Sequence, residues 1–497
     1  MSKIEINADF INDIISKVMQ AAESGLSLDV NDGDEVGKYV CAILALGAEL
    51  IPVVGEALGA FISFLGAIFF SPMSMEKIWD YLRERIEALI DAKIAEYHLK
   101  TLKQKILGLQ DNMTVYRQYL RDWKNATGAD KDKAATTLHN SHVAFSAVVL
   151  AAIPEFQVDD YAVASLPMFA LVANMYLALL VDGIKQGEEW GYSPQNIQSM
   201  MDQFRSKTTP QDSKTLNDDY LSHQKSALEE AIKAGPELGV PANVLDTWRE
   251  AYAVLFEPGK DPKSGNEGLD YVSYSKKIYT QGRSEVKPYS SDIQTVGGDI
   301  ACEYRAYADY DTSMIMNVLN YAELWPFMTG DPITESALKN LDREIFFGPY
   351  GRYAYHASWD PSTPPPVNDR GLPITGLIIR GWDAVDGIQI KQGDTWGSWQ
   401  GSSTGGAPQQ LDLAADEWIE SFDILYGQKL VNVKLSTNKG HSIENGDAVH
   451  GGVNRIGAPP GYEMTSIIIT NYESHIPPGC EGIIFGFRSL MTDSSRG

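Results

Sequence analysis

Residues 161–181 read YAVASLPMFALVANMYLALLV, a stretch without a single charged side chain. The chain around it is strongly acidic, with a formal net charge of −25 over 497 residues. Asp159 and Asp160 precede the stretch and Asp182 follows it. A helix of this length is long enough to cross a bilayer. The stretch therefore predicts either the buried central helix of a large bundle or a helix that enters a membrane after folding in water.

Composition narrows the class of protein. Hydrophobic residues make up 44% of the chain, which supports full-sized cores, and the length predicts two or three domains. The negative charge argues against nucleic acid as a partner and against simple adsorption to anionic lipid. Cys41, Cys302 and Cys480 are too few and too far apart for a disulfide framework or a metal site. We expect no metal ion and no cofactor.

The N-terminal sequence MSKIEINADF lacks a basic region followed by an apolar core. It therefore predicts synthesis without a secretory signal peptide, in the cytoplasm or an inclusion of the producing cell.

The chain up to residue 340 has mostly helical periodicity. Residues 39–70 are nearly uncharged and are broken by Pro52 and several glycines, which predicts two helices or one kinked helix. Amphipathic helices are expected over 75–123 and 134–153. His142 falls on the apolar stripe of the 134–153 helix, where a buried, hydrogen-bonded histidine is favoured over a ligand.

Two further segments complete this part of the chain. Residues 257–287 are rich in Gly, Pro, Ser and Lys and predict a long loop, which is a candidate site for proteolysis. Residues 299–328 predict a return to helix.

The composition of the sequence changes at Arg343, after which glycines, prolines and alternating apolar residues dominate. The alternation predicts an all-β domain over 341–497. Its short strands are expected near 374–379, 386–390, 418–424, 431–435, 465–470 and 483–487.

The helical part resembles the N-terminal pore-forming domain of insecticidal crystal toxins, the delta-endotoxins. The matching segments are EALIDAKIAEY at 87–97, GEEWGYS at 187–193, EYRAY at 303–307 with LWPF at 324–327, and LDREIF at 341–346. The resemblance implies a seven-helix bundle over 1–340 with a central apolar helix. It also implies that the central helix and the one before it insert as a hairpin, and that Arg343 and Glu344 join the two domains.

The C-terminal part resembles jacalin-like β-prism lectins. The matching segments are FGPYG at 347–351, WDAVDGI at 382–388, LAADEWI at 413–419 and TNKG at 437–440. The resemblance implies a receptor- or glycan-binding β-prism, with Gly351, Tyr353 and Asp493 as candidate contacts. The chain departs from the lectin pattern after Gly486, where FRSLMTDSSRG replaces the usual sugar-binding loop.

A loop rich in tryptophan adds a second candidate surface. Residues 392–401 read QGDTWGSWQG, and Trp396 and Trp399 stand among glycines. Tryptophans on loops stack on sugar faces or enter lipid interfaces. The alternative, with equal weight, is that one or both fill the prism core.

The sequence contains no metalloprotease, Walker or dinucleotide-binding motif. GSSTG at 401–405 fits the letters of a nucleophile elbow, but GAPQ follows where a helix is required. We therefore predict a protein that is not an enzyme.

The pattern suggests how a folded bundle becomes a membrane protein. In water an apolar helix over 161–181 needs cover on all sides, whereas in a bilayer lipid replaces that cover. Proteolysis, receptor binding or oligomerisation would supply the free energy for the change. In the pore, Thr136, Asn140 and Ser146 would face water.

The prediction is a pore-forming insecticidal toxin whose partners are a target-cell membrane, a glycan or protein receptor, and further copies of itself. The alternatives are a lectin-like defence protein that forms no pore, or one component of a binary toxin. The side chains assigned to membrane insertion are Leu138, His142, Phe145, Val149, Ile153, Phe156, Tyr161, Leu166, Phe169, Asn174, Leu177 and Leu180.

Overall fold

A computed structural model describes residues 96–210, 229–237, 239–246, 269–290, 296–329, 334–353, 359–447, 454–457, 462–471 and 479–489, with Ile90, Ile94 and Arg249. The helix predicted over 39–70, most of 75–95 and Asp493 lie outside these residues, so the predicted count of seven helices is not tested. The α-helices are α5 (Glu96–Asn125), α6 (Ala129–Ala152), α7 (Ala162–Gln186), α8 (Pro194–Thr208), α11 (Tyr271–Ser284), α12 (Val296–Met314), α13 (Asn320–Leu324) and α14 (Glu335–Leu341).

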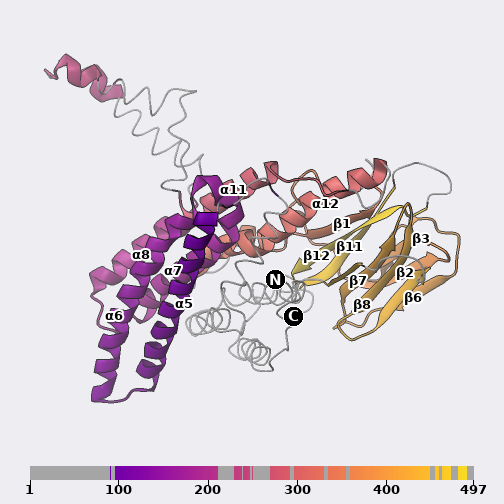
Figure 1. The fold of residues 1–497 in the computed structure, drawn as a ribbon, viewed down its shortest axis with the longest axis horizontal. Helices are drawn as coiled ribbons and strands as arrows, with labels where there is room; N and C mark the ends of the chain where they lie inside the picture. The colour runs from indigo at the N-terminus through magenta and orange to yellow at the C-terminus, as the bar shows by residue number, and fades with distance from the viewer. Residues whose placement is uncertain are drawn as a thin grey trace.

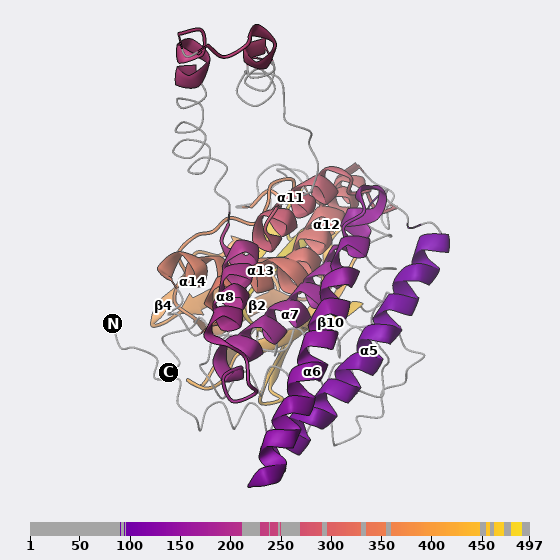
Figure 2. The ribbon, with the colours of Figure 1, turned by 90° about the vertical axis from the view of Figure 1, so that its left-hand side faces the viewer.

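The helical region is built around α7, which contains the charge-free stretch. Every residue of α7 from Ala162 to Gly183 is buried. Helices α6, α8 and α11 pack directly against it, and α5 packs against α6 (Figures 1 and 2). The prediction of a central apolar helix is confirmed, because an element apolar on all sides stays in water only when its neighbours cover it.

The prediction of a loop over 257–287 is wrong for residues Tyr271–Ser284, which form a helix. Residues Tyr271–Ser284 form the helix α11, and Asp270 begins it by accepting a hydrogen bond from the Ser273 backbone N–H. Tyr274 and Ile278 are buried against the core at helical spacing. Polar composition concealed the periodicity, because the buried face is made largely of tyrosine and serine. Residues 257–268 lie outside the described residues.

A continuous helical run follows α12. It passes through a π-helical turn, η4 (Ile315–Leu319), then α13, and ends in the short 3-10 helix η5 (Trp325–Phe327). A π turn widens the helix and leaves one residue out of the normal bonding pattern, and such turns recur at functional sites.

The C-terminal part is a β-prism made of three antiparallel sheets. Their strand orders are β1-β12-β11, β10-β7-β8-β9 and β4-β3-β2-β6, with β5 paired to β3. The predicted all-β prism is confirmed. The strands are β1 (Ile345–Gly351), β2 (Ile374–Gly381), β3 (Val385–Gln392), β4 (Thr395–Trp396), β5 (Gln400–Gly401), β6 (Pro408–Asp412), β7 (Ile419–Tyr426), β8 (Leu430–Thr437), β9 (Ser442–Gly446), β10 (Asn454–Gly457), β11 (Tyr462–Thr470) and β12 (Gly482–Ser489).

Side chains from all three sheets meet inside the prism. Leu377, Phe422 and Phe485, one from each sheet, are almost completely buried. Phe422 stacks on Phe485 with ring centroids 4.1 Å apart. The side-chain amide of Gln400 joins two sheets, because it donates to the Ile467 carbonyl and accepts from the Ile469 N–H of β11.

Helix α12 connects the two parts of the molecule. It lies along β1 at the edge of the three-stranded sheet (Figure 1). The backbone N–H of Tyr353 donates to the Gly297 carbonyl at 3.0 Å, and the Tyr304 ring meets the Tyr353 ring edge-on. The prism therefore shares a packed interface with the last long helix of the helical region.

Candidate membrane-insertion and receptor-binding sites

Helix α6 presents its predicted stripe to the core. Leu138, His142, Phe145 and Val149 recur at intervals of three or four residues and are all buried. The opposite face also carries apolar side chains, including Val143, which is 49% exposed. The second half of the helix is therefore apolar on both faces, although one of them is exposed to water.

The turn between the two helices is compact. Two 3-10 turns, η1 (Ile153–Phe156) and η2 (Asp159–Tyr161), join α6 to α7, and Ile153, Phe156 and Tyr161 are buried. Ser165 on the first turn of α7 donates to the Phe156 carbonyl at 2.7 Å. The turn satisfies part of its polar groups from within, and Glu155 also pairs with Lys105 of α5 at 3.0 Å.

His142 bonds α6 to α7 inside the hairpin. Its Nε2 lies 2.7 Å from the Leu179 carbonyl and its Nδ1 lies 2.8 Å from the Tyr192 hydroxyl. Because a carbonyl only accepts, Nε2 carries the proton and Nδ1 accepts from the hydroxyl. Burial lowers the pKa of His142 to about 4, so the ring is neutral at pH 7. A Cβ on Gly183 would lie 2.4 Å from Met200 Sδ and 3.0 Å from this ring, so glycine makes room for both side chains.

Asp182 bonds α7 to α5. Its carboxyl group is buried and accepts a hydrogen bond from the Tyr116 hydroxyl at 2.9 Å. Burial raises the pKa of Asp182 to about 8, against the smaller lowering effects of Tyr116 and Lys124. At neutral pH the folded protein therefore holds mostly the uncharged carboxylic acid here.

Two further polar side chains of α7 bond outside the hairpin. The Trp325 indole N–H in η5 donates to the Asn174 side-chain oxygen, and both residues are buried. The Tyr176 hydroxyl donates to Gln203 of α8 at 2.8 Å. Helix α7 is thus held in water by specific bonds to α5, α8 and η5 as well as by apolar packing.

The remaining insertion candidates on α7 are core residues. Leu166, Phe169, Leu177 and Leu180 are each at most 3% exposed. Phe169 contacts the Tyr274 ring of α11 at a centroid distance of 4.5 Å. By length and composition two segments of the described chain could span a membrane, Ala129–Phe156 and Asp159–Gln186. These are the two arms of the predicted hairpin.

The tryptophan loop of the prism lies at the surface. Trp396 ends β4 and Trp399 precedes β5, and both side chains are half-buried. The Arg380 guanidinium lies over the Trp399 ring at 5.8 Å. Gly397 fixes the loop by donating to the Ile390 carbonyl at 2.9 Å. Neither tryptophan belongs to the prism core, so of the two alternatives the surface position holds.

Two other receptor candidates occupy structural positions. Tyr353 is 2% exposed and packs under α12, and Gly351 pairs with Gly482 at the end of β1. Gly351 has φ of 88°, and a Cβ there would lie 2.3 Å from the Glu481 carbonyl oxygen. The prediction that these two contact a receptor does not fit this conformation, because α12 covers Tyr353 and the backbone of Glu481 and Gly482 crowds Gly351. The lectin resemblance did not reveal this cover.

Arg343 and Glu344 point to opposite sides of the junction. The Arg343 side chain lines a pocket among the helices, whereas Glu344 accepts a hydrogen bond from Thr465 of β11 at 2.6 Å. A Cβ on Gly486 would lie 2.3 Å from the Glu344 carboxylate, so that glycine makes room for it.

Sequence reasoning did not single out three residues that the structure brings forward. They are Tyr116, Trp325 and Trp382, and Trp382 at the β2–β3 turn is 82% exposed. The sequence does not show that Trp382 is exposed. It does not show that Tyr116 pairs with Asp182 or Trp325 with Asn174 either, because these residues are far apart in the chain. Within the described ranges, no group of three or more His, Cys, Asp or Glu side chains could hold a metal ion.

The fold and the buried apolar hairpin together define a two-part protein, a helical bundle with a latent membrane-length hairpin joined to a β-prism. Residues 43–230 match the family described as delta endotoxin, N-terminal domain. This part of the chain is thus similar to a delta-endotoxin N-terminal domain, which agrees with the resemblance seen in the sequence. The match to this toxin family supports the prediction that the protein is not an enzyme.

Curated relatives match about a third of the chain. The pesticidal crystal protein Cry7Ab of Bacillus thuringiensis subsp. dakota is 31% identical over 168 residues, which cover 31% of this chain and 15% of the relative. Cry8Ba of Bacillus thuringiensis serovar kumamotoensis is 30% identical over 165 residues, covering 33% and 13%. The chain thus spans less than one sixth of the length of these relatives.

Solved structures share the fold over almost the whole chain. The insecticidal delta-endotoxin Cry8Ea1 of Bacillus thuringiensis has a TM-score of 0.56 at 17% identity, covering 92% of this chain and 74% of that one. PirB has a TM-score of 0.52 at 11% identity, covering 94% of this chain and 96% of that one. At these identities the likeness describes the fold. The assignment of the β-prism rests on the strand order of its three sheets.

Proposed function

We propose that this protein is a pore-forming insecticidal toxin that inserts the α6–α7 hairpin into a target-cell membrane. The observation that carries the proposal is the hairpin itself. Its two arms are each long and apolar enough to span a bilayer, and they are adjacent, antiparallel and joined by a short internally bonded turn. The curated relatives are pesticidal crystal proteins, which is consistent with this activity.

The hydrogen bonds divide into those that travel with the hairpin and those that break. The bond from His142 to the Leu179 carbonyl joins the two arms, so it survives insertion. The bonds of Asp182, Asn174 and Tyr176 to α5, η5 and α8 must be given up. A protonated carboxyl at Asp182 lowers the cost of moving α7, because a neutral acid is cheaper in lipid than a carboxylate.

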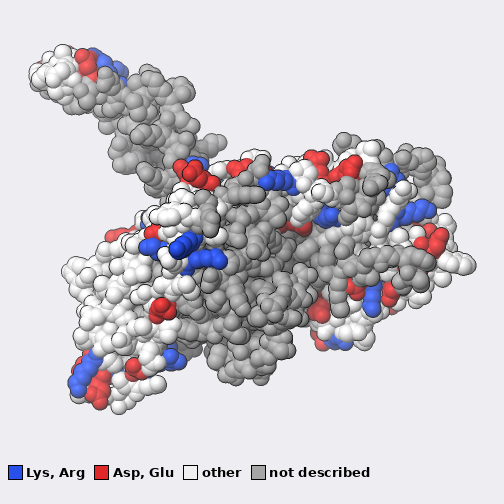
Figure 3. Space-filling model, viewed as in Figure 1, with Lys and Arg blue, Asp and Glu red and all other residues white. Residues whose placement is uncertain are grey.

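The uncharged surface of α6 supports the same step. Figure 3 shows charged side chains gathered at the end where α5 passes into α6, and mostly uncharged surface along α6. The exposed Lys133–Asp130 pair lies at that end. The charged end would stay in water while the rest of the hairpin crosses the bilayer.

The β-prism is the proposed receptor-binding part. Its candidate surface comprises Trp396 and Trp399 of the 392–401 loop, and Trp382 at the β2–β3 turn is a separate candidate contact. Aromatic rings at this degree of exposure are typical contacts for glycans and protein receptors. Tyr353 is left out of this surface because α12 covers it, and Gly351 because Glu481 and Gly482 crowd it. Asp493 stays a candidate from the sequence.

Receptor binding, proteolysis or assembly into a homo-oligomer would shift the balance from the soluble to the inserted form. The protein would then act at the membrane of the host cell. Because hairpin release requires α7 to leave α11, a covalent link between these helices should prevent it.

The test is a reversible lock between α7 and α11. A Cβ on Gly282 would lie 2.3 Å from Val163 Cγ1, close enough for a disulfide, and 2.1 Å from the Tyr310 hydroxyl. The variant V163C/G282C/Y310F therefore creates the link and removes the obstructing oxygen. Dye release from vesicles made of insect midgut membranes is measured for protease-treated protein, oxidised and reduced.

The proposal expects no leakage from the oxidised variant and restored leakage after reduction, with binding to the vesicles equal in both states. Equal leakage from both states would exclude this hairpin as the inserting element. Saturating binding without leakage by the unmodified protein would instead favour a lectin-like protein or a component that needs a second chain.

A further inference from the structure

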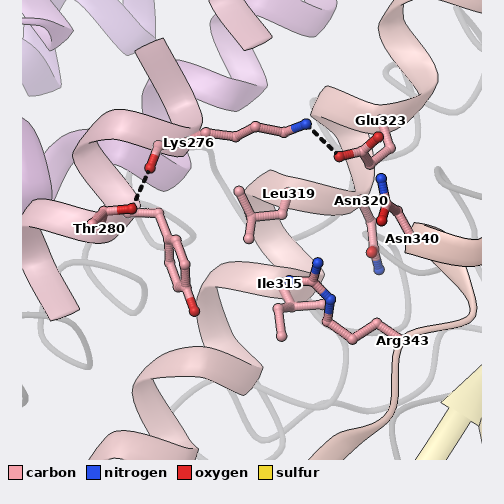
Figure 4. A pocket seen from close by; sticks show the side chains of 9 residues that line it. Lys276, Thr280, Ile315, Leu319, Asn320, Glu323, Asn340 and Arg343 are labelled. Atoms are coloured by element: carbon pink, nitrogen blue, oxygen red, sulfur yellow. Dashed lines mark hydrogen bonds and ion pairs between the residues drawn. The ribbon is translucent and has the colours of Figure 1, made fainter. Parts of the chain in front are cut away.

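A pocket of about 330 Å³ lies where the helical region meets the chain segment that enters the prism. Its walls come from α11, the π turn η4, α13 and α14, and Arg343 closes one side from the segment before β1 (Figure 4). The pocket is separate from the tryptophan surface and from the α6–α7 hairpin.

Arg343 differs from the other buried arginines at the junction. Its Nε is buried, and among the described residues no acceptor bonds to any nitrogen of its side chain. Arg352, Arg370 and Arg380 also lack an acceptor at Nε, but their terminal nitrogens bind Glu481, Asp342 and the Gly406 carbonyl. The side chain of Arg343 is half-buried and lines the pocket, and a buried N–H without an acceptor is costly, so the site favours an oxyanion.

The opposite wall of the pocket is already neutral. Lys276 of α11 forms an ion pair with Glu323 of α13, with Nζ and Oε1 2.7 Å apart (Figure 4). The nearest buried acid behind Arg343, Asp311, is held by Arg283 through both carboxylate oxygens. Arg343 interacts with the Asp311 carboxyl group electrostatically but forms no hydrogen bond with it, so Arg343 supplies the positive charge of the pocket that has no bonded acceptor.

The rest of the lining suits a small organic ligand. Ile315 and Leu319 of the π turn supply an apolar surface between the two charged ends. Asn320 donates its side-chain N–H to Tyr462, which leaves its amide oxygen as an acceptor toward the pocket, and Asn340 adds a second amide. A few convergent polar groups beside apolar side chains are typical of small-molecule sites.

We propose that this pocket binds a small organic carboxylate, whose carboxylate group pairs with the planar guanidinium of Arg343 and whose aliphatic part lies on Ile315 and Leu319. Arginine matches a carboxylate through two parallel N–H···O bonds, which fixes the orientation of the ligand. The size of the pocket limits the ligand to a small molecule.

Occupancy would stabilise the soluble form. The ligand touches α11, α13 and the segment that begins the prism, and α11 packs on α7 through Tyr274 and Phe169. A ligand that binds only the folded arrangement stabilises it by mass action. The pocket would thus act as a clamp on the element that must separate from α7.

The experiment measures binding to the full chain by calorimetry and thermal unfolding, without vesicles, so its result does not depend on pore formation. The probes are glutarate, its uncharged analogue glutaramide, and inorganic phosphate at matched ionic strength. Glutarate should bind saturably and raise Tm by about 3 °C at hundredfold excess over Kd. Glutaramide should have no effect, and phosphate should bind at least tenfold more weakly because it has no aliphatic part.

The variants locate the site. R343Q should reduce glutarate affinity at least tenfold while leaving the ligand-free Tm unchanged or higher, and R343K should give an intermediate affinity. K434Q on the prism surface serves as the control and should bind as the unmodified protein does. Equal glutarate binding by R343Q, or no binding by the unmodified protein with only water in the pocket, would overturn the proposal. A large fall in the ligand-free Tm of R343Q would assign Arg343 a purely structural role.

Discussion

Helices α6 and α7 are both long and apolar enough to cross a membrane, yet they differ in how much of their surface is exposed to water. The most apolar window of α7 is completely buried, whereas only 33% of the corresponding window of α6 is buried. Helix α7 is the core of the bundle and α6 is part of its cover. The difference teaches that α6, which covers α7, exposes more apolar side chains than a soluble protein requires. These exposed apolar side chains indicate that α6 also enters a lipid environment.

The comparison predicts its largest effect in the core. Phe169→Ala removes a completely buried ring that packs against α11, and should lower the free energy of unfolding by about 3–5 kcal/mol. Val143→Ala on the exposed face of α6 should change it by less than about 0.5 kcal/mol. Denaturant unfolding followed by circular dichroism measures both. Equal losses would mean that the two helices do not differ in role.

The bond between Trp325 and Asn174 should have the next largest effect. Trp325→Phe leaves the Asn174 side-chain oxygen buried without a donor and should cost up to about 3 kcal/mol. The double variant W325F/N174L removes both polar partners and should recover part of the loss. If the double variant is as unstable as the sum of its single variants, the packing of the indole matters rather than its hydrogen bond.

Asp182 should make the bundle less stable as the solution becomes alkaline. Its pKa is raised to about 8 in the folded state, so the folded protein binds a proton that the unfolded chain releases. Stability from this group therefore falls as pH rises from about 4 to 8. Below pH 6.5 the lowered pKa of His142, about 4, acts in the opposite sense because the unfolded chain binds the proton.

The net fall attributable to Asp182 should therefore appear between about pH 6.5 and 8, with a size of about 2 kcal/mol. Asp182→Asn should remove most of it. The measurement is the free energy of unfolding at pH 6.5 and at pH 8 for both proteins. An identical difference in the two proteins would show that another group titrates.

Much of this contrast could be predicted from sequence, because it depends on periodicity. The burial of α7 follows from its uncharged run, and the burial of one face of α6 follows from the spacing of Leu138, His142 and Phe145. The strands β2, β3 and β8 follow in the same way from the alternation of apolar and polar residues. Helix α11 was missed because its buried face is made largely of tyrosine and serine, which a hydrophobic pattern does not register. The edge strand β6 was missed because its side chains, including Gln409 and Gln410, are mostly polar and exposed.

The pairings that hold α7 could not be predicted in this way. Tyr116 and Asp182 are 66 residues apart, and Trp325 and Asn174 are 151 apart. Only the folded chain brings them together. The cover that α12 places over Tyr353 likewise depends on the contact between the two parts of the molecule.

The smallest effect on the soluble fold is expected on the exposed face of α6, and it gives the most direct test of the central claim. The variant V148D puts a carboxylate on a side chain that is 41% exposed in water and that lies, at helical spacing, off the face of Thr136 and Asn140 that would line the pore. Its Tm should match that of the unmodified protein, while dye release from midgut vesicles should be lost, because a charge inside the bilayer costs about 2.5–3.5 kcal/mol or more. The uncharged, isosteric control V148T should release dye normally. Undiminished release by V148D would contradict the account, since α6 would then not enter the membrane.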